Sequence, residues 1–430
     1  MSELYERIRT EVDGIQLVDT HEHLMSEGAR LERKLDFFYW FCHYASSDVI
    51  SAGFPEGKRE WLLDPDVPLD ERWASFAPYW EHARTTGYGR ALLIAARDLF
   101  EVEDINAATY SVLSDKLARS NRPGWYEYVL KERAGIDVSV LQSLEEYDPI
   151  ALDQVDRRFF APVVCMNDFI MPCDQVALDA LSAQAGLPIH CLQELLAVVD
   201  RRLEQGVEAQ VVGVKVSLAY QRTLQFDRAL RNDAEGAFNL LFQTFVRRGV
   251  QQPPASVAEL KPLHDYLMHH VVRRSMDLGL PMQVHTGLQE GNGNILANSN
   301  PLHLVNLFLE YPEQKFDLFH AGYPWQSEMA TLGKSFANVF VDMCWLHVIS
   351  PWVARQTLHE WIETVPSNKI FGFGGDYIFV EGAYAHAQMA RADVAQVLAE
   401  KVEARYLTED EAIGLARKIL RENAKKFFGL

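Results

Sequence analysis

Short apolar runs alternate with amphipathic stretches along most of this chain. Several runs, such as VVGVKVSL from Val211 and NVFVDMC from Asn338, are apolar and β-branched at successive positions. Strands of a parallel sheet covered on both faces have this character, because neither set of side chains meets water. The pattern predicts strands at Gln16–Thr20, Asp137–Gln142, Pro162–Met166, Val211–Leu218, Pro281–Thr286, Lys315–His320, Asn338–Met343 and Lys369–Phe373.

Helical periodicity fills most of the intervals between these runs. His264–Leu278 precedes the run LPMQVHTG, and Pro301–Tyr311 precedes KFDLFHAG. Alternating strands and helices are typical of the α/β class, and eight such strands favour a (β/α)8 TIM barrel. We therefore expect one barrel domain over residues 1–430, with its active site at the carboxyl ends of the strands.

Two long segments interrupt the alternation. Residues 25–133 follow the first strand, and residues 219–258 follow the fourth strand and contain QQPPAS, which reads as a turn or loop. The first insert has helical and aromatic character, so we expect it to cover the barrel mouth or to pack between subunits. The alternative is that both inserts are helical additions at the periphery of the barrel. At the chain's end, Thr408 and Glu411 form a capping-box pattern that opens a helix over residues 408–430.

Composition narrows the function classes. Of 430 residues, 48% are hydrophobic and 23% charged, as in ordinary globular proteins. The formal charge of -19 disfavours nucleic-acid binding, and neither a signal peptide nor a membrane-length apolar run is evident. The five scattered cysteines suggest neither disulfides nor a zinc-thiolate site. We expect a cytoplasmic homo-oligomer that binds a small molecule and neither nucleic acid nor membrane.

The first predicted strand ends in a pair of histidines, in LVDTHEHL. Residues i and i+2 of a strand share one face, so His21 and His23 converge while Glu22 points away. Convergent imidazoles suit a metal ion, although an HxH pair at a strand end also arises by chance. Further ligands from other strands would decide between these interpretations.

Three other strand ends carry polar residues of the same kind. The fifth strand ends in QVHTG with His285, the sixth in LFHAG with His320, and the eighth in FGFGGDY with Asp376. A histidine at a strand end is often a satisfied core residue, and an Asp after Gly-Gly is often a cap. Taken with the HxH pair, however, the matching positions predict a metal site at one rim of the barrel.

This constellation resembles the amidohydrolase superfamily, whose barrels carry HxH on strand one, His on strands five and six, and Asp on strand eight. Asn423 and the final Phe428-Gly429-Leu430 also match a common family ending. Within the superfamily, HTGLQEGNGNILANSNPLHL and HAGYPWQSEMATLGKSFANVFVDM are similar to the amidohydrolase-like domain of glutamine-synthetase-like fusion proteins. That branch also includes aromatic-acid decarboxylases, and the long insert is similar to that of uronate isomerases.

The resemblance implies a ligand set. It makes His21, His23, His285 and Asp376 metal ligands, with His320 either a ligand or a group that polarises the substrate. We expect one divalent metal, Zn²⁺ before Mn²⁺ or Fe²⁺. The number of metal ions depends on Lys215, because a carboxylated lysine on strand four bridges two metals in binuclear members of the superfamily. Alternatively, Lys215 has a structural role or binds a carboxylate of the substrate.

The implied chemistry is hydrolysis of a small, carboxylated amide or lactone. The metal lowers the pKa of a bound water, Asp376 accepts and passes on the proton, and His320 stabilises the oxyanion. A decarboxylase or a uronate-type isomerase can use the same site, and a non-enzymatic binding barrel is a third class. We expect the substrate to be bound by Lys215 on strand four and by residues that follow strand ends: Tyr220, Arg222, Glu290, Tyr323, Trp325 and Trp345.

Overall fold

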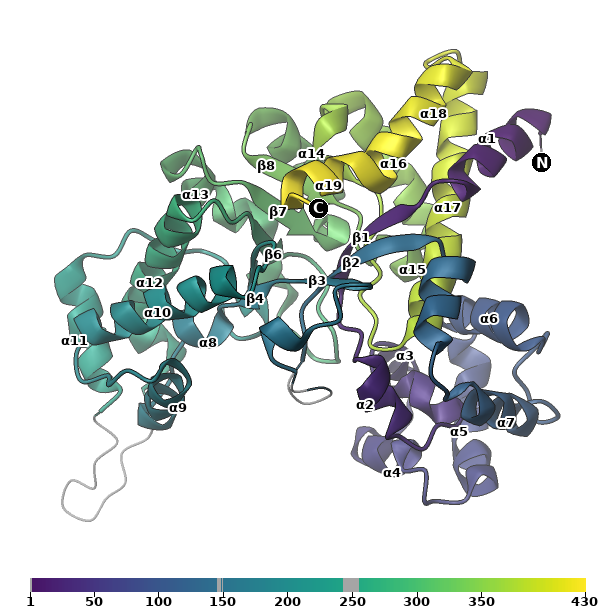
Figure 1. The fold of residues 1–430 in the computed structure, drawn as a ribbon, viewed down its shortest axis with the longest axis horizontal. Helices are drawn as coiled ribbons and strands as arrows, with labels where there is room; N and C mark the ends of the chain where they lie inside the picture. The colour runs from purple at the N-terminus through teal and green to yellow at the C-terminus, as the bar shows by residue number, and fades with distance from the viewer. Residues whose placement is uncertain (1, 145–147, 149, 243–254) are drawn as a thin grey trace. The chain divides into compact units, whose positions relative to one another are not determined.

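The computed structural model describes residues 2–144, 148, 150–242 and 255–430 (Figure 1). Contacts divide the chain into two compact units. Unit 1 comprises Met1–Ala161, Glu290–Asn294 and Asp342–Leu430, and unit 2 comprises Pro162–Gln289 and Ile295–Val341. Part of the predicted second insert, residues 243–254 with the QQPP sequence, lies outside the described residues.

Unit 1 contains the first predicted strands. β1 (Leu17–Glu22) pairs in parallel with β2 (Ile136–Leu141), and β3 (Phe160–Pro162) follows β2 in the same sheet. The segment after β9 (Ile370–Phe371) runs along β1, since Thr20 N–H donates to Phe373 O (3.1 Å) and Asp376 N–H to His21 O (2.9 Å). These hydrogen bonds set Asp376 beside the end of β1.

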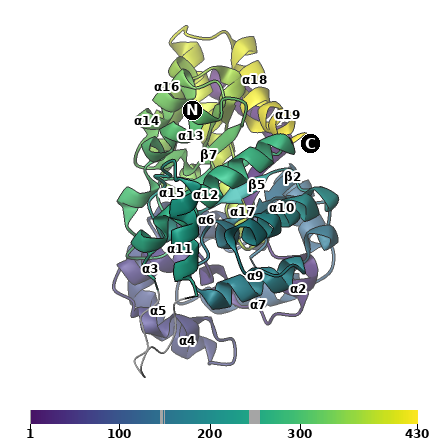
Figure 2. The ribbon, with the colours of Figure 1, turned by 90° about the vertical axis from the view of Figure 1, so that its left-hand side faces the viewer.

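Unit 2 contains a run of parallel strands paired in chain order. These are β4 (Val164–Cys165), β5 (Val214–Val216), β6 (Met282–His285), β7 (Phe316–Phe319) and β8 (Val339–Asp342). Helices connect them, with α10 (Leu192–Glu208) and α11 (Arg231–Leu240) packed on α12 (Val257–Asp277) (Figure 2). The shorter α8 (Asn167–Ile170), α9 (Gln175–Ala185), α13 (Val305–Glu310) and α14 (Gln326–Ser335) complete this unit.

The observed strands confirm the α/β prediction of parallel strands. Each predicted run overlaps an observed strand, and the side chains of β1, β6 and β7 are buried throughout. The third run differs, because its first part belongs to β3 and its last part to β4, with Val163 between them. Val163 is where the chain leaves the sheet of β1 and β2 and enters the sheet of β5.

The first insert is helical and has its own hydrophobic core. A 3-10 turn, Phe37–Phe41, packs its rings against Phe76 and Trp80. A Cβ on Gly87 would lie 1.6 Å from Val348 O, so glycine lets the first turn of α6 approach α15 (Leu346–Ile349). The helices of the insert are α2 (Glu27–Leu31), α3 (Ala45–Ser51), α4 (Arg59–Leu63), α5 (Leu69–Ala83), α6 (Gly87–Phe100) and α7 (Tyr110–Ser120).

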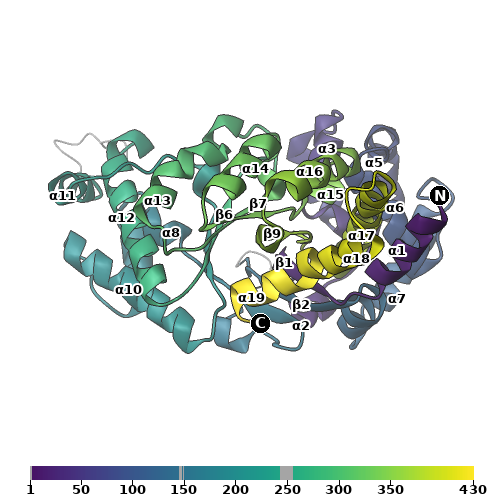
Figure 3. The same ribbon diagram turned by 90° about the horizontal axis from the view of Figure 1, so that it is seen from above.

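The C-terminal helices complete unit 1. α17 (Val380–Glu403) packs against α1 (Glu3–Asp13), α6, α16 (Pro351–Thr364) and α18 (Glu409–Arg417) (Figure 3). The capping box of Thr408 and Glu411 is confirmed, and α19 (Asn423–Phe428) ends the chain. Among the described helices, none combines the length and apolar character needed to cross a membrane.

Candidate metal centre

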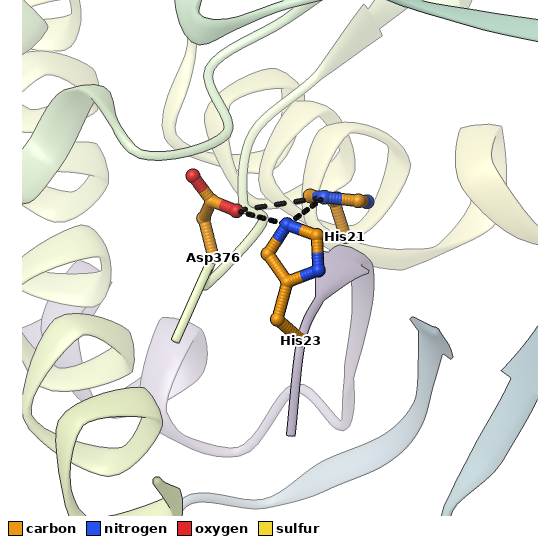
Figure 4. A group of neighbouring side chains, drawn as sticks. All are labelled: His21, His23 and Asp376. Carbon is orange, nitrogen blue, oxygen red and sulfur yellow. Dashed lines mark hydrogen bonds and ion pairs between the residues drawn. The ribbon is translucent and has the colours of Figure 1, made fainter. Parts of the chain in front are cut away.

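Three side chains of unit 1 bring ligand atoms together at the end of β1 (Figure 4). His21 Nε2 lies 3.2 Å from His23 Nε2, and Asp376 Oδ1 lies 3.5 and 3.3 Å from these two nitrogens. The side chains are 0, 10 and 1% exposed, respectively. Strand periodicity thus places both imidazoles on one side, and the ladder with residues 373–376 adds the carboxylate.

The spacing of these atoms fits a divalent transition metal. Zinc bonds of about 2.0–2.2 Å in tetrahedral geometry hold ligand atoms about 3.3 Å apart. His23 Nδ1 lies 2.9 Å from Gln142 O, a carbonyl that can only accept, so Nδ1–H donates and Nε2 keeps its lone pair. A ligating histidine is commonly oriented by such an outer hydrogen bond. The imidazole and carboxylate donors therefore fit Zn²⁺, Mn²⁺ or Fe²⁺.

The Gly-Gly-Asp sequence has a steric reason. A Cβ on Gly375 would lie 1.7 Å from Glu22 Oε1, and one on Gly374 would lie 2.5 Å from Thr20 Oγ1, so both positions require glycine. Asp376 itself has φ 60°, in the left-handed region that few residues other than glycine adopt. The close passage along β1 and this unusual backbone together aim the carboxylate at the two histidines.

Two buried carboxylates accept hydrogen bonds from the backbone of the loop that carries Asp376. Asp19 Oδ1 accepts from the backbone N–H of Gly375 (2.9 Å), and Glu22 Oε2 accepts from that of Tyr377 (2.6 Å). Burial raises the pKa of Asp19 to about 6, and burial together with the neighbouring Asp19 charge raises the pKa of Glu22 well above its usual range. Asp19 and Glu22 thus accept from the backbone on either side of Asp376, and neither belongs to the group of ligand atoms.

The insert contributes a further residue to this centre. Tyr44 donates its hydroxyl to Asp376 Oδ2 at 2.5 Å, and its ring lies 3.8 Å from that of His43 and 4.3 Å from that of Trp345. His43 is also a neighbour of His23, with ring centroids 6.1 Å apart. In the sequence Tyr44 is one of many aromatic residues of the insert, and no spacing connects it to Asp376.

A second histidine pair lies within unit 2. His320 Nε2 is 3.0 Å from His285 Nδ1, and His285 Nε2 is 2.9 Å from Leu288 O. The carbonyl can only accept, so His285 carries its proton on Nε2 and presents an Nδ1 lone pair toward His320. His320, like Asp376, has a left-handed backbone (φ 67°), and the Tyr220 ring lies 5.1 Å from that of His285. The strand ends therefore bring His285 and His320 together as a pair, while their part in metal binding stays a prediction.

Lys215 has interior partners. Lys215 is 1% exposed. On β5 it pairs in register with Gln283 of β6, which in turn pairs with Asp317 of β7. Its ammonium lies 4.4 Å from the centre of the Phe319 ring, and Gln283 donates to Asp317 at 3.0 Å. Burial raises the pKa of Asp317 to about 7, while the Lys215 charge acts in the opposite direction. This polar row across the sheet favours the structural interpretation of Lys215.

Arg222 is held inside unit 2. It is 4% exposed and donates to Asp265 at 2.6 Å and to Gln225 O at 2.8 Å. These bonds fix the loop of Arg222 to α12, and its role in substrate binding stays a prediction. Trp345 lies beside Tyr44 in unit 1; Glu290, Tyr323 and Trp325 are half-buried, and their substrate contacts stay predictions.

Comparison with known proteins establishes the family. A profile of the family described as "Amidohydrolase" matches residues 167–430, more than half of the chain. The chain belongs to the amidohydrolase family. Protein fluG of Emericella nidulans is 30% identical over 233 residues, which cover 51% of this chain and 26% of that protein. The chain therefore spans about a quarter of the length of that relative.

Solved structures share the fold. The uronate isomerase of Thermotoga maritima is 15% identical and superposes with a TM-score of 0.80, covering 100% of this chain and 98% of its own. The glucuronate isomerase of Caulobacter crescentus is 17% identical, with a TM-score of 0.76 and coverage of 99 and 94%. These similarities confirm the amidohydrolase-type TIM-barrel fold class that the strand and helix pattern predicts.

Proposed function

We propose that this chain is a metal-dependent hydrolase acting on a small, carboxylated amide or lactone. One observation carries the proposal: His21 Nε2, His23 Nε2 and Asp376 Oδ1 converge at the spacing of ligand atoms around one metal ion. A divalent metal bound there supplies a Lewis acid and lowers the pKa of water toward neutrality. We expect Zn²⁺, with Mn²⁺ or Fe²⁺ as replacements.

Asp376 is the proposed proton carrier. Its Oδ1 faces the histidines, while its Oδ2 accepts the hydroxyl of Tyr44. A carboxylate held in this way can take a proton from the attacking water and return it to the leaving group. Tyr44 acts as a positioning residue, because its hydrogen bond fixes the rotation of the carboxylate while leaving Oδ1 directed at the ligands.

Aromatic side chains make the surroundings of this carboxylate apolar. Tyr44 packs against Trp345 and Tyr88, with ring centroids 4.3 and 5.7 Å apart, and all three residues are buried. Excluding water from a charged group strengthens its interactions with neighbouring charges and dipoles. The apolar surroundings therefore screen the charge of the Asp376 carboxylate only weakly during proton transfer.

Isomerisation of a sugar acid is the second candidate. The hydrogen bond between Tyr44 and Asp376 favours it, since a carboxylate beside a phenol can remove a proton at one position of a substrate and return it at the next. Uronate and glucuronate isomerases share the fold at 15 and 17% identity. Decarboxylation of an aromatic acid uses the same kind of site and is the third chemistry to test.

A metal analysis followed by a substrate screen tests the proposal. Purified wild-type protein and the His21→Ala variant are analysed for metal and assayed with amides, lactones, uronates and aromatic acids in ¹⁸O-water. Hydrolysis places one ¹⁸O atom in the product, isomerisation leaves the mass of the substrate unchanged, and decarboxylation releases CO2. We expect ¹⁸O incorporation by the wild type alone; turnover by metal-free protein at the wild-type rate would overturn the proposal.

A further inference from the structure

A histidine of α17 bonds the backbone of the segment that carries Asp376. His386 Nδ1 lies 2.9 Å from the carbonyl oxygen of Gly375. This carbonyl belongs to the peptide group that joins Gly375 to Asp376, and the N–H of the same peptide group donates to His21 O at 2.9 Å. Both polar groups of one peptide unit are therefore hydrogen-bonded, one to a side chain and the other to β1.

The backbone at Asp376 depends on the orientation of this peptide group. Glycine adopts many backbone conformations, so Gly375 alone does not hold the group in one orientation. Asp376 has φ 60°, in the left-handed region, which costs conformational free energy for a residue with a Cβ. Rotation of the peptide group would change this angle and with it the direction of the Asp376 side chain. The two hydrogen bonds oppose that rotation.

The His386 ring has a fixed and enclosed position. The side chain is fully buried, and its ring centroid lies 5.3 Å from that of Phe373 and 6.1 Å from that of Tyr377. A Cβ on Gly382 would lie 2.1 Å from Cδ1 of Tyr377, so glycine at this position lets the tyrosine ring pack against α17. The two residues that flank Gly374–Asp376 thus pack against the ring whose Nδ1 bonds the segment between them.

His386 donates this hydrogen bond as a neutral imidazole. The Gly375 carbonyl can only accept, so His386 carries its proton on Nδ1. Its Nε2 is buried without a hydrogen-bond partner among the described residues, so a second proton there would leave an unpaired N–H. Burial, with the neighbouring His347 acting in the same direction, lowers the pKa of His386 to about 3. The bond is therefore present throughout the neutral pH range.

We propose that His386 is a positioning residue for Asp376. It lies outside the group of ligand atoms and acts through Gly375, because it holds the peptide group that sets the backbone of Asp376. The direction of the carboxylate toward His21 and His23, and toward the Tyr44 hydroxyl, follows from that backbone. The expected effect on turnover rests on the proposed function, whereas the expected effect on the backbone does not.

Crystal structures of the metal-free full-length protein test this role. Wild type is compared with His386→Leu, which fills the space without a donor, and with His386→Asn, whose amide can donate to Gly375 O. His264→Leu is the matched control, because His264 Nε2 also lies 3.1 Å from a backbone carbonyl, that of Pro172, and is fully buried in unit 2. In His386→Leu we expect Asp376 to leave the left-handed region and its distance to the Tyr44 hydroxyl to exceed about 3.5 Å. His386→Asn and His264→Leu should keep both features.

Cobalt binding and turnover give two further measurements. The visible absorption of Co²⁺ reports the geometry of its ligands. We expect His386→Leu to bind Co²⁺ roughly tenfold more weakly with a shifted spectrum, and to lose roughly tenfold or more in turnover. His386→Asn should recover the spectrum and most of the turnover, and His264→Leu should change only the melting temperature. Should His386→Leu not fold, His386→Gln replaces it, since its amide lies one bond farther from the backbone.

Three results would overturn the proposal. The first is an unchanged Asp376 backbone in the variant that lacks the donor. The second is a His386→Asn variant that behaves like that variant, since packing of the ring and not its Nδ1–H would then be the cause. The third is the same displacement of Asp376 in His264→Leu. Failure of the wild type to bind Co²⁺ would instead contradict the proposed function, and the crystal structures would still decide the role of His386.

Discussion

The hydroxyl of Tyr44 donates a 2.5 Å hydrogen bond to Oδ2 of Asp376, across 332 positions of the sequence. Tyr44 belongs to the insert that follows the first strand, and Asp376 follows the last strand. The insert is therefore part of the candidate metal centre and not only a covering layer. This bond connects a carboxylate with metal-ligand geometry to a second ionisable group.

Replacing Tyr44 by Phe removes this bond and keeps the ring that packs on Trp345. We expect the metal content and the melting temperature to stay near wild type, while turnover falls by roughly 10- to 100-fold, because Asp376 loses its orienting donor. Tyr88→Phe is the matched control, since the Tyr88 hydroxyl is buried without a hydrogen-bond partner among the described residues. An equal loss of turnover in both variants would contradict the positioning role.

Metal content distinguishes the two histidine groups. His21→Ala removes one of three ligand atoms that lie within 4.8 Å of one another, so we expect it to lose most of about one metal equivalent. His285→Ala tests whether the pair in unit 2 also supplies a ligand, and the family resemblance predicts a similar loss. Elemental analysis after gel filtration measures both, with His82→Ala, an exposed histidine of the insert, as control. Full occupancy in either ligand variant would remove that residue from the ligand set.

A buried ion pair joins the insert to the C-terminal part of unit 1. Arg30 donates to Glu381 at 2.6 and 3.1 Å, and Trp125 Nε1 donates to the same carboxylate at 2.7 Å. Removing one partner leaves a buried charge, which typically costs about 3–5 kcal/mol. We expect Arg30→Met to lower the free energy of unfolding by about this amount in urea titrations, and Arg30→Met/Glu381→Met to recover much of it. A double variant no more stable than Arg30→Met would show that packing, not the unpaired charge, causes the loss.

Acid should destabilise the fold through His264 on α12. Burial lowers the pKa of His264 from 6.5 to about 4. Below pH 6.5 the unfolded chain therefore binds a proton that the folded chain excludes, and stability falls as the pH drops toward 4. At pH 5 this proton linkage lowers the free energy of unfolding by about 2 kcal/mol.

His264→Gln removes that titration. When the pH is lowered from 7.5 to 5, the free energy of unfolding of the variant should rise by about 2 kcal/mol relative to that of the wild type. This holds whatever the stability of the variant at pH 7.5. Urea denaturation at both pH values measures the difference, and His82→Gln, exposed in the insert, is the control. A difference that does not change with pH would show that His264 accepts its proton in the folded state.

The sequence predicts those parts of the site that depend on strand periodicity. His21 and His23 converge because they are two residues apart at the end of a buried strand, and the positions of His285 and His320 follow from the same rule. Asp376 follows from the Gly-Gly-Asp turn that closes the last apolar run. The local pattern sets the direction of His21 and His23, whereas the hydrogen bonds along β1 and a left-handed backbone set that of Asp376.

Other features depend on contacts between distant segments, which no local pattern encodes. Tyr44 reaches Asp376 only through the folding of the insert, and one of six neighbouring aromatics cannot be singled out from its sequence. Arg222 donates to Asp265 of α12, 43 residues away, and no local pattern in the sequence predicts this pairing.

Asp376→Asn separates catalysis from metal binding. The amide keeps the shape of the side chain, and its oxygen can still face His21 and His23, whose imidazoles carry most of the affinity for the metal. The variant no longer accepts a proton, so we expect at least half the wild-type metal content with turnover reduced by roughly two to four orders of magnitude. Asp115→Asn, at an exposed position on α7, should change neither quantity. Turnover of Asp376→Asn near the wild-type rate would transfer the proton-carrying role from Asp376 to another group, and His320→Asn is then the variant to assay.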